Sequence, residues 1–398
     1  MGNFSILDTL IDYRGKTPNK VERGIPLITA KIVKNGRIET PTEFLPTEDY
    51  NGWMVRGFPQ VGDVVLTTEA PLGEVAQLTD EKIALAQRIV CLRGKEGVLD
   101  NTYLKYFFLS NIGQNRLKAR ETGTTVTGIK QSELKEILID YPKIDTQKAI
   151  ASVLSSLDDK IELNRRINDN LEQQAQALFK SWFVDNPNPN WSETTLSEIA
   201  NFIGGYSYKG EELTDSSNIA MVTIKNFGRN GGFKADGFKG ITPSAKLKEC
   251  HYANLFDILV AHTDLTQNAD VIGNAELLLT YDRYDSIIFS MDLVKVLPKN
   301  NFPYRFLLAA MLKNKIFKGH CLGYVNGTTV LHLSKKALPE FEVRIPSKVE
   351  AKTMNDTLAP YYKRMAEVLQ ENDRLMQLRD TLLPKLMSGE LRISEIEK

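Results

Sequence analysis

The sequence predicts an α+β protein made of two copies of one unit, each with short β-strands followed by a long α-helix. Three observations lead to this expectation. One segment pattern occurs twice, β-branched runs fill the first part of each copy, and a long apolar periodicity closes each copy. The chain of 398 residues also exceeds one ordinary domain, because roughly 150 residues per domain predicts two or three.

The internal repeat is the strongest pattern. Gly123-Thr124-Thr125-Val126 recurs as Gly327-Thr328-Thr329-Val330, an offset of 204 that continues through the helical stretch that follows. Upstream, residues 25–31 match residues 219–225 at an offset of 194. The second copy therefore has 10 more residues, and we expect one enlarged loop between Asp257 and Ser290.

Short β-like runs come first in each copy. Residues 63–67, 89–92 and 293–297 are rich in β-branched side chains and bounded by Gly, Pro and Asn, which is typical of strands. Residues 102–110 and the matching residues 304–312 predict one helix among them.

Each copy closes with a long helix whose apolar residues follow a 4-3 spacing. A sustained stripe of this kind predicts a coiled coil with a partner helix, and a polar residue within it can fix the register. The alternative is that each helix packs only on its own domain. Aromatic residues near the end of the first helix are also candidate contacts for partner proteins. The predicted coiled-coil or partner interface comprises Leu154, Leu157, Ile161, Asn168, Leu171, Leu178, Phe179, Trp182 and Phe183, with Leu358, Met365, Asn372, Leu375 and Leu382.

Composition limits the class of protein. The 50 basic and 50 acidic residues cancel, which argues against a strongly basic nucleic-acid binder but allows lysines to gather on local surfaces. The 3 cysteines are widely spaced and odd in number, as expected in a reducing cytoplasm. We find no signal-peptide pattern and no apolar run of about 18 residues, so we expect a cytoplasmic protein without a membrane partner.

Candidate catalytic patterns have simpler explanations. Residues 185–190, Asp-Asn-Pro-Asn-Pro-Asn, form a helix-ending linker rather than a base-gripping loop, because no aromatic residue follows the prolines. Glu133 and Lys135 have the spacing of a nuclease metal site, but the second copy lacks it. The pairs Cys250-His251 and His320-Cys321 lack the spacing of structural zinc sites. We therefore predict no catalytic residue, no metal and no cofactor.

The order and duplication of several short motifs resemble the DNA-specificity subunits of type I restriction-modification systems, the HsdS family. The similarity covers essentially the whole chain. Two departures occur: the first copy has Phe4 near the place of the opening Trp191, and Ala351 stands where the first copy has Gln147. The motifs that carry the resemblance are residues 191–199 with Gly204-Gly205, 24–28, 61–64, 264–269, the two Gly-Thr-Thr segments, Pro142 with Gln147 and Ile150, and the tail 382–391.

The resemblance implies two pseudo-symmetric α/β target recognition domains separated by an antiparallel coiled coil of two long helices. The implied segments are recognition domain 1 (1–142), the central helical spacer (143–186), recognition domain 2 (187–346) and the C-terminal helical spacer (347–398). It further implies a non-catalytic subunit whose domains each read one half of a bipartite site in double-stranded DNA. Two adenine methyltransferase (modification) subunits would dock on the helices, and motor-nuclease (restriction) subunits would join through them.

Two kinds of segment in each copy are candidates for DNA contact: the polar turn after the first shared strand, and the Gly-Thr-Thr segment. Base edges need polar side chains, and phosphates need cations and backbone N–H groups. The alternative is that Gly-Thr-Thr is only a turn repeated with the fold. The candidates in the first copy are Lys31, Lys34, Asn35, Arg37, Gly123, Thr124, Thr125 and Lys130. Those in the second copy are Lys225, Asn226, Arg229, His262, Thr263, Gln267, Asn268, Gly327, Thr328, Thr329 and Lys335.

Two other functions stay open from the sequence. One is an enzyme that combines recognition with nuclease activity, which a metal-dependent cleavage assay would detect. The other is a coiled-coil adaptor whose domains bind protein or sugar, which the near-zero net charge allows.

Overall fold

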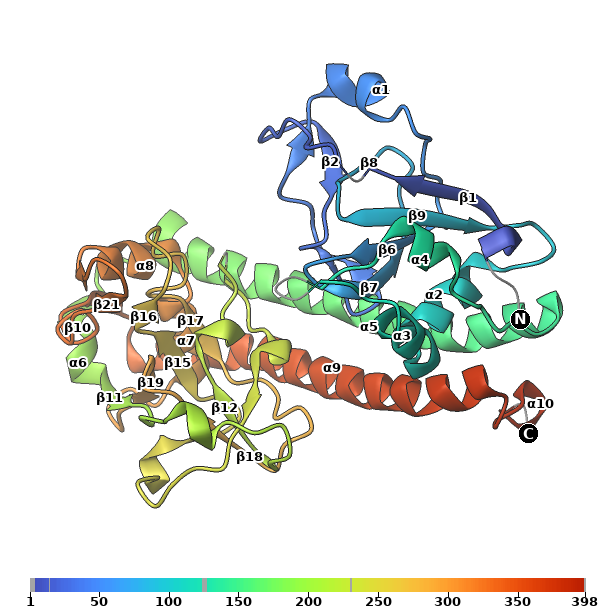
Figure 1. The fold of residues 1–398 in the computed structure, drawn as a ribbon. Helices are drawn as coiled ribbons and strands as arrows, with labels where there is room; N and C mark the ends of the chain where they lie inside the picture. Colours follow the sequence, from blue (N-terminus) through green and yellow to red (C-terminus); the bar gives the residue numbers. More distant parts are fainter. Residues whose placement is uncertain (1–3, 14, 124–126, 230, 397–398) are drawn as a thin grey trace. The chain divides into compact units, whose positions relative to one another are not determined.

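The structure is a computed structural model that describes residues 4–13, 15–123, 127–229 and 231–396. It divides into two compact units. Unit 1 comprises Met1–Lys160 and Leu375–Lys398, and unit 2 comprises Ile161–Arg374. The division therefore passes through both long helices (Figure 1).

Unit 1 is built on a four-stranded antiparallel sheet of order β1-β9-β6-β7. Val64, Leu66 and Val90 face the core beneath helix α2, whereas Val65 and Cys91 face a second core, because successive side chains in a strand alternate between faces. The sheet strands are β1 (Leu7–Asp12), β9 (Ile89–Gly94), β6 (Val64–Thr68) and β7 (Leu72–Gln77). The smaller strands are β2 (Ile25–Ile28), β3 (Val33–Lys34), β4 (Arg37–Ile38), β5 (Phe44–Leu45) and β8 (Ala84–Leu85). The short helices are α1 (Tyr50–Trp53), α2 (Asn101–Leu109), α3 (Asn111–Lys118) and α4 (Gln131–Lys135).

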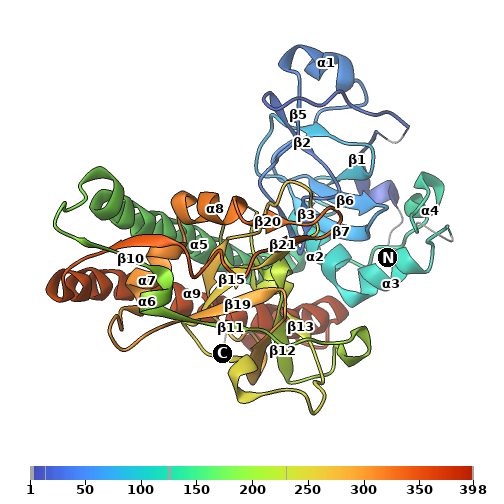
Figure 2. The same ribbon diagram turned by 90° about the vertical axis from the view of Figure 1, so that its left-hand side faces the viewer.

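Unit 2 repeats this plan. Its main sheet has the order β11-β19-β15-β17, and β11, β19 and β15 can be found by their labels in Figure 2. Strand β12 pairs in parallel with β18 as β2 does with β8. The sheet strands are β11 (Ala200–Gly204), β19 (Leu293–Pro298), β15 (Ile258–Ala261) and β17 (Ala275–Leu277). The smaller strands are β10 (Ser192–Thr195), β12 (Ile219–Val222), β13 (Lys239–Gly240), β14 (Tyr252–Ala253), β16 (Thr263–Asp264), β18 (Ser286–Phe289), β20 (Val325–Asn326), β21 (Leu331–Leu333) and β22 (Glu342–Ile345). The short helices are α6 (Leu196–Ile199), α7 (Arg305–Leu312) and α8 (Lys315–Leu322).

The shared topology confirms the duplication, but the expectation of one enlarged loop was wrong. Val64 pairs with Gln77, and Ile258 pairs with Leu277, so the offset between the copies rises from 194 to 200 across this hairpin. Leu27 pairs with Ala84, and Met221 pairs with Ile288, which brings the offset to 204. The second copy therefore gains 6 residues between β15 and β17 and 4 residues between β17 and β18. The sequence offset gives only the total number of inserted residues, whereas the strand register shows where each insertion lies.

The long helices are α5 (Ile144–Lys180), which runs into a π-helical turn at Ser181–Asp185, and α9 (Lys348–Ser388). Within unit 2 their parts pair antiparallel, since Asn164 Nδ2 donates to Asn372 Oδ1 over 2.9 Å while the later Asn168 Nδ2 donates to the earlier Met365 O over 3.4 Å. Within unit 1, Arg379 Nη1 donates to Asp158 Oδ1 over 2.9 Å. The predicted partner helix is confirmed, and the alternative of isolated helices is excluded within each unit.

The two polar residues singled out from the sequence, Asn168 and Asn372, do not pair with each other. An antiparallel register instead places Asn372 beside Asn164, one turn before Asn168. Of the predicted interface residues, Leu154, Ile161, Phe179, Leu358, Met365 and Asn372 are buried. The others are half-buried: Leu157, Asn168, Leu171, Leu178, Trp182, Phe183, Leu375 and Leu382. Phe179 stacks on Phe183 at 4.7 Å between ring centroids, Phe183 packs on Trp191 at 4.8 Å, and Trp182 packs against the same core, so all three aromatics lie within unit 2.

Searches of the described residues found neither a helix long and apolar enough to cross a membrane nor a group of three or more His, Cys, Asp or Glu residues arranged to hold a metal ion.

Candidate nucleic-acid interface

In unit 2, tertiary structure brings together two segments that lie far apart in the sequence. Strand β15 continues through His262 into β16, which pairs with β21. The hairpin of β20 and β21 carries Gly327, Thr328 and Thr329 at its turn. Gln267 Nε2 donates to Thr328 O over 2.8 Å, so the loop after β16 and the Gly-Thr-Thr turn form one polar surface. The predicted candidates from both segments are neighbours.

The glycine of this turn is required by the backbone. Gly327 has φ +112°, and a Cβ there would lie 2.2 Å from Val330 O. A side chain is therefore excluded at this position. The backbone geometry of the turn is thus enough to explain why position 327 is a glycine. Thr328 and Thr329, by contrast, are exposed and available to a ligand.

The loop after β16 is held in one conformation by Asp264. Its carboxylate accepts hydrogen bonds from Thr266 N at 2.8 Å, Thr266 Oγ1 at 2.9 Å and Val271 N at 2.7 Å. Burial disfavours the charged form, but these donors outweigh it and hold the pKa of Asp264 below its ordinary value. Leu265 projects from this loop with 68% of its surface exposed, and Gln267 and Asn268 are also exposed.

Unit 1 has the same arrangement in shorter form. Glu69, which follows β6, forms a bridge with Gly128, and Ile129 N donates to Thr68 O over 2.9 Å. Gly123 has φ +110°, close to the value at Gly327. Thr124 and Thr125 lie outside the described residues, and Lys130 is exposed before α4. Both units thus extend the third strand of the sheet onto the segment that follows Gly-Thr-Thr.

The polar turn of unit 1 is a two-residue hairpin between β3 and β4. Asn35 and Gly36 have φ of 51° and 83°, which is the geometry of a type I′ turn and explains the Asn-Gly pair. Asn35 N donates to Glu74 Oε2 on β7 over 2.8 Å. Lys31, Lys34 and Asn35 are exposed, and Arg37 is half-buried.

The cations of this turn have acidic neighbours. Lys34 Nζ lies 3.3 Å from Glu39, Arg37 Nη2 lies 3.8 Å from Glu39, and Lys31 Nζ lies 3.9 Å from Glu43. Such surface pairs contribute only about 0–1 kcal/mol, so a phosphate can compete for the cations.

The polar turn of unit 2 is longer and glycine-rich. Asn226 is fully buried: its Oδ1 accepts from Thr223 N at 2.9 Å and its Nδ2 donates to Lys234 O at 2.8 Å. In this structure Asn226 therefore fixes the turn. Lys225 and Arg229 are exposed, and Arg229 Nε lies 3.5 Å from Asp270 Oδ2.

Histidines lie at the base of the unit 2 surface. His262 is half-buried, and burial, with His332 and Lys335 nearby, lowers the pKa of its imidazole. Thr263 is buried, with its Oγ1 3.5 Å from His332 Nδ1, whereas Lys335 is exposed. Sequence reasoning missed His332, Glu74, Asn274 and Glu276 as neighbours of these segments. Only strand pairing places them there, and no short motif contains them.

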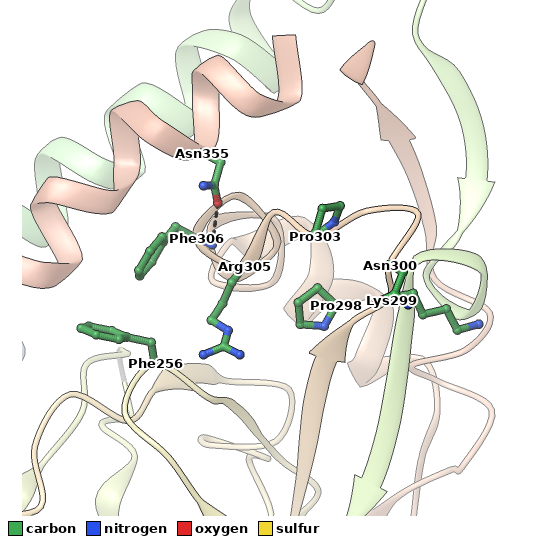
Figure 3. Close-up of a pocket in the computed structure, with 8 residues that line it drawn as sticks. All are labelled: Phe256, Pro298, Lys299, Asn300, Pro303, Arg305, Phe306 and Asn355. Carbon is green, nitrogen blue, oxygen red and sulfur yellow. Dashed lines mark hydrogen bonds between the residues drawn. The ribbon is translucent and has the colours of Figure 1, made fainter. Parts of the chain in front are cut away.

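A pocket of about 400 Å³ lies beside the start of α7 in unit 2 (Figure 3). Asn355 of α9 accepts from Phe306 N over 3.0 Å and so caps α7. Phe256 and Phe306 pack edge to face, with ring centroids 5.4 Å apart, and Arg305 projects beside them. In unit 1 the junction between α2 and the long helix α5 is instead made by the buried Gln147, whose side-chain oxygen accepts a hydrogen bond from Asp100 N, at the start of α2, over 2.9 Å. These contacts explain why Ala351 can replace Gln147 in the second copy.

A duplicated α/β unit with paired loop segments, joined to antiparallel helices, defines a tandem recognition architecture. A model of the family described as "Type I restriction modification DNA specificity domain" matches residues 10–173 and 188–375. The chain therefore belongs to this family and carries two copies of its domain.

Similar proteins agree. The chain is 28% identical over 362 residues to the type I restriction enzyme MjaIX specificity subunit of Methanocaldococcus jannaschii, covering 86% of this chain and 80% of the relative. It is 26% identical to the HindI specificity subunit of Haemophilus influenzae, covering 69% of this chain and 74% of the relative. A crystal structure of a type I restriction-modification S subunit from M. genitalium has a TM-score of 0.50 and 20% identity, covering 97% of this chain and 95% of that one, and supports the fold.

Proposed function

We propose that this chain is the DNA-specificity subunit of a type I restriction-modification complex, in which each unit reads one half of a bipartite site in double-stranded DNA. The observation that carries the proposal is the duplicated surface. In each unit a strand pairs with the segment that follows Gly-Thr-Thr, and a polar turn follows the first shared strand.

Different side chains on the two surfaces support different half-sites. The turn of unit 1 presents Lys34 and Asn35, whereas the surface of unit 2 adds the exposed Gln267 and Asn268. Asn and Gln can bond adenine through two hydrogen bonds, and lysine can contact guanine or phosphate. The segments 1–142 and 187–346 are our proposed recognition domains.

The helices, segments 143–186 and 347–398, are proposed to set the spacer and dock two methyltransferase subunits, with motor-nuclease subunits joining through these. Helix α5 has 37 residues, about 55 Å of helix, which exceeds one DNA turn of about 34 Å. Leu163 and Val349 expose 53% and 79% of their surfaces and are available to a partner. In this proposal, base methylation and DNA cleavage belong to the partners.

Domain exchange tests the proposal. Residues 191–346 are replaced by the equivalent segment of a related specificity subunit, and the chimaera is expressed with the cognate methyltransferase. Methylome sequencing should show one half-site changed, with the other half-site and the spacer kept. If both half-sites change together, the units do not read independently. Lengthening α5 by one turn is the control, because it should alter the spacer alone.

A further inference from the structure

The glycine-rich loop of residues 228–232 is held at both ends by buried side chains. Asn274 Nδ2 donates to Gly228 O over 2.7 Å, and Gly232 N donates to Glu276 Oε1 over 2.6 Å. Gly228 N donates to Gly232 O over 2.9 Å and closes the loop. Arg229 stands exposed within this closed loop. The two anchors therefore decide where its guanidinium is presented.

A buried charged cluster stands behind Glu276. Lys313 Nζ, at the end of α7, donates to Glu276 Oε2 and lies 3.2 Å from Glu172 Oε2 on α5. The side chains of Lys313, Glu276 and Glu172 expose only 4%, 3% and 15% of their surfaces. An unbroken series of polar contacts thus joins the loop to helix α5.

Fold stability alone does not explain this cluster. Two carboxylates share one lysine, and apolar residues of similar volume often stabilise a core as well as buried ions do. Burial and the charge of Glu172 raise the pKa of Glu276, although Lys313 opposes them. Each oxygen of Glu276 has one partner, the lysine on one side and the loop N–H on the other.

The corresponding loop of unit 1 is held by a carboxylate in a different environment. Its Asn35-Gly36 hairpin has the two-residue geometry favoured between antiparallel strands. The carboxylate that meets this turn, Glu74, lies near the surface and accepts a single N–H. The loop of unit 2 is also closed by its own backbone, since Gly231 N donates to Gly228 O over 3.0 Å, but its carboxylate anchor is buried and paired with a lysine.

We propose that Glu276 is a positioning residue for DNA recognition: with Lys313 and Glu172 it holds Gly232, and so sets how Arg229 of the same loop meets phosphates or guanine edges of one half-site. This inference rests on the proposed function. It assigns to a buried acidic residue an effect on the reading of one half of the site.

The test uses the full chain with its cognate methyltransferase and reads the methylome. The half-site of unit 2 is first identified from the domain exchange. Glu276→Leu removes the acceptor for Gly232 N, and methylation at sites with one wrong base in that half should rise about tenfold, the selectivity that one base contact gives. Glu276→Gln keeps an oxygen acceptor and should retain wild-type selectivity. The matched control, Glu74→Leu, should leave the half-site of unit 2 unchanged.

The other outcomes overturn the inference. If Glu276→Leu relaxes both half-sites equally, or if Glu276→Gln relaxes them as much, the cluster only stabilises the fold. Wild-type selectivity in Glu276→Leu would also overturn it. If that variant does not fold, the double change Glu276→Leu with Lys313→Met removes the same acceptor together with the buried cation that pairs with it. It should relax the unit 2 half-site alone, and unchanged selectivity would again refute the inference. A wild-type complex without a bipartite methylation motif would instead contradict the proposed function.

Discussion

The two units place the ionic attachment between a long helix and the neighbouring short helix at different positions. In unit 1, Asp158 of α5 accepts hydrogen bonds from Lys105 Nζ at 2.9 Å, Tyr106 Oη at 2.6 Å and Arg379 Nη1 at 2.9 Å. At the offset of 204, Tyr362 takes the place of Asp158 in unit 2 and is fully buried in its apolar core. The structure keeps this offset through the short helices, because the N-caps of α3 and α8 are Ser110 and Asn314, and it thereby corrects the sequence match of residues 102–110 with 304–312. The partners Lys105, Tyr106 and Arg379 are therefore replaced by Ala309, Ala310 and Ala175.

This comparison shows that a buried charge and its partners change together. An unpaired ion in a core is strongly destabilising, whereas a complete ionic set and a well-packed apolar set have similar stability. Unit 2 has its own buried ions, but they lie at Lys313, at the end of α7. The repeat therefore preserves the fold while the polar anchor has a different position.

The largest expected effect comes from breaking the set in unit 1. Asp158→Ala leaves Lys105 and Arg379 without their shared carboxylate, and we expect a loss of about 3–5 kcal/mol in unfolding free energy. Denaturant unfolding measures it. The matched variant changes all four positions to the unit 2 residues, Lys105→Ala, Tyr106→Ala, Asp158→Tyr and Arg379→Ala, and should lose much less. Equal losses would show that the residues do not act as a set.

Breaking the set in unit 2 should have a somewhat smaller effect. Lys313→Met leaves Glu172 and Glu276 facing each other, but protonation of one carboxylate relieves the repulsion. We expect a loss of about 3 kcal/mol near neutral pH that shrinks as the pH falls. Unfolding at pH 5 and pH 8 measures this. Adding Glu276→Gln should recover part of the loss, and a loss that is the same at both pH values would contradict the interpretation.

Two aspartates of the long helices should respond to pH in opposite directions. Burial raises the pKa of the Asp373 carboxyl to about 6, and the hydrogen bond that it accepts from Thr280 Oγ1 at 2.7 Å only partly opposes this rise. Its protonated form stabilises the fold, and that contribution is lost as the pH rises through about 6. Asp373→Asn should therefore stabilise the protein at pH 8 by about 1–2 kcal/mol and have little effect at pH 4.

Asp158 provides the contrast. Burial disfavours its charge, but Lys105, Tyr106 and Arg379 outweigh burial and lower its pKa. Its contribution is present above the ordinary carboxyl pKa and is lost as the pH falls through the lowered value. The same pH profile for variants at both positions would refute this assignment.

The smallest expected effect concerns the polar layer of the helix pair in unit 2. Asn164→Leu leaves the buried Asn372 without its 2.9 Å partner, and a loss of about 1–2 kcal/mol should follow. The double change Asn164→Leu with Asn372→Leu should be nearly neutral. Thermal unfolding of the single and double variants checks this, and strictly additive losses would mean that the two amides are not coupled.

The sequence by itself determined the duplication, the long helices, the sheet strands β6, β9 and β19, and the family resemblance. These features depend on local periodicity or on a repeated offset. The Gly-Thr-Thr segments were also visible, because the backbone at their glycine restricts the residue type, and so was a polar turn within residues 31–37, although its Asn-Gly geometry came from the structure.

Only the tertiary structure decided which segments meet. The contact of Gln267 with Thr328, the burial of Asn226 and the anchoring of Gly232 by Glu276 depend on strand register and on residues distant in the chain. The same is true of the pairing of Asn372 with Asn164, which follows from the antiparallel arrangement of the helices. A pattern along one chain shows which side chains share a face, but the partner of a polar group is set by whichever distant element packs against it.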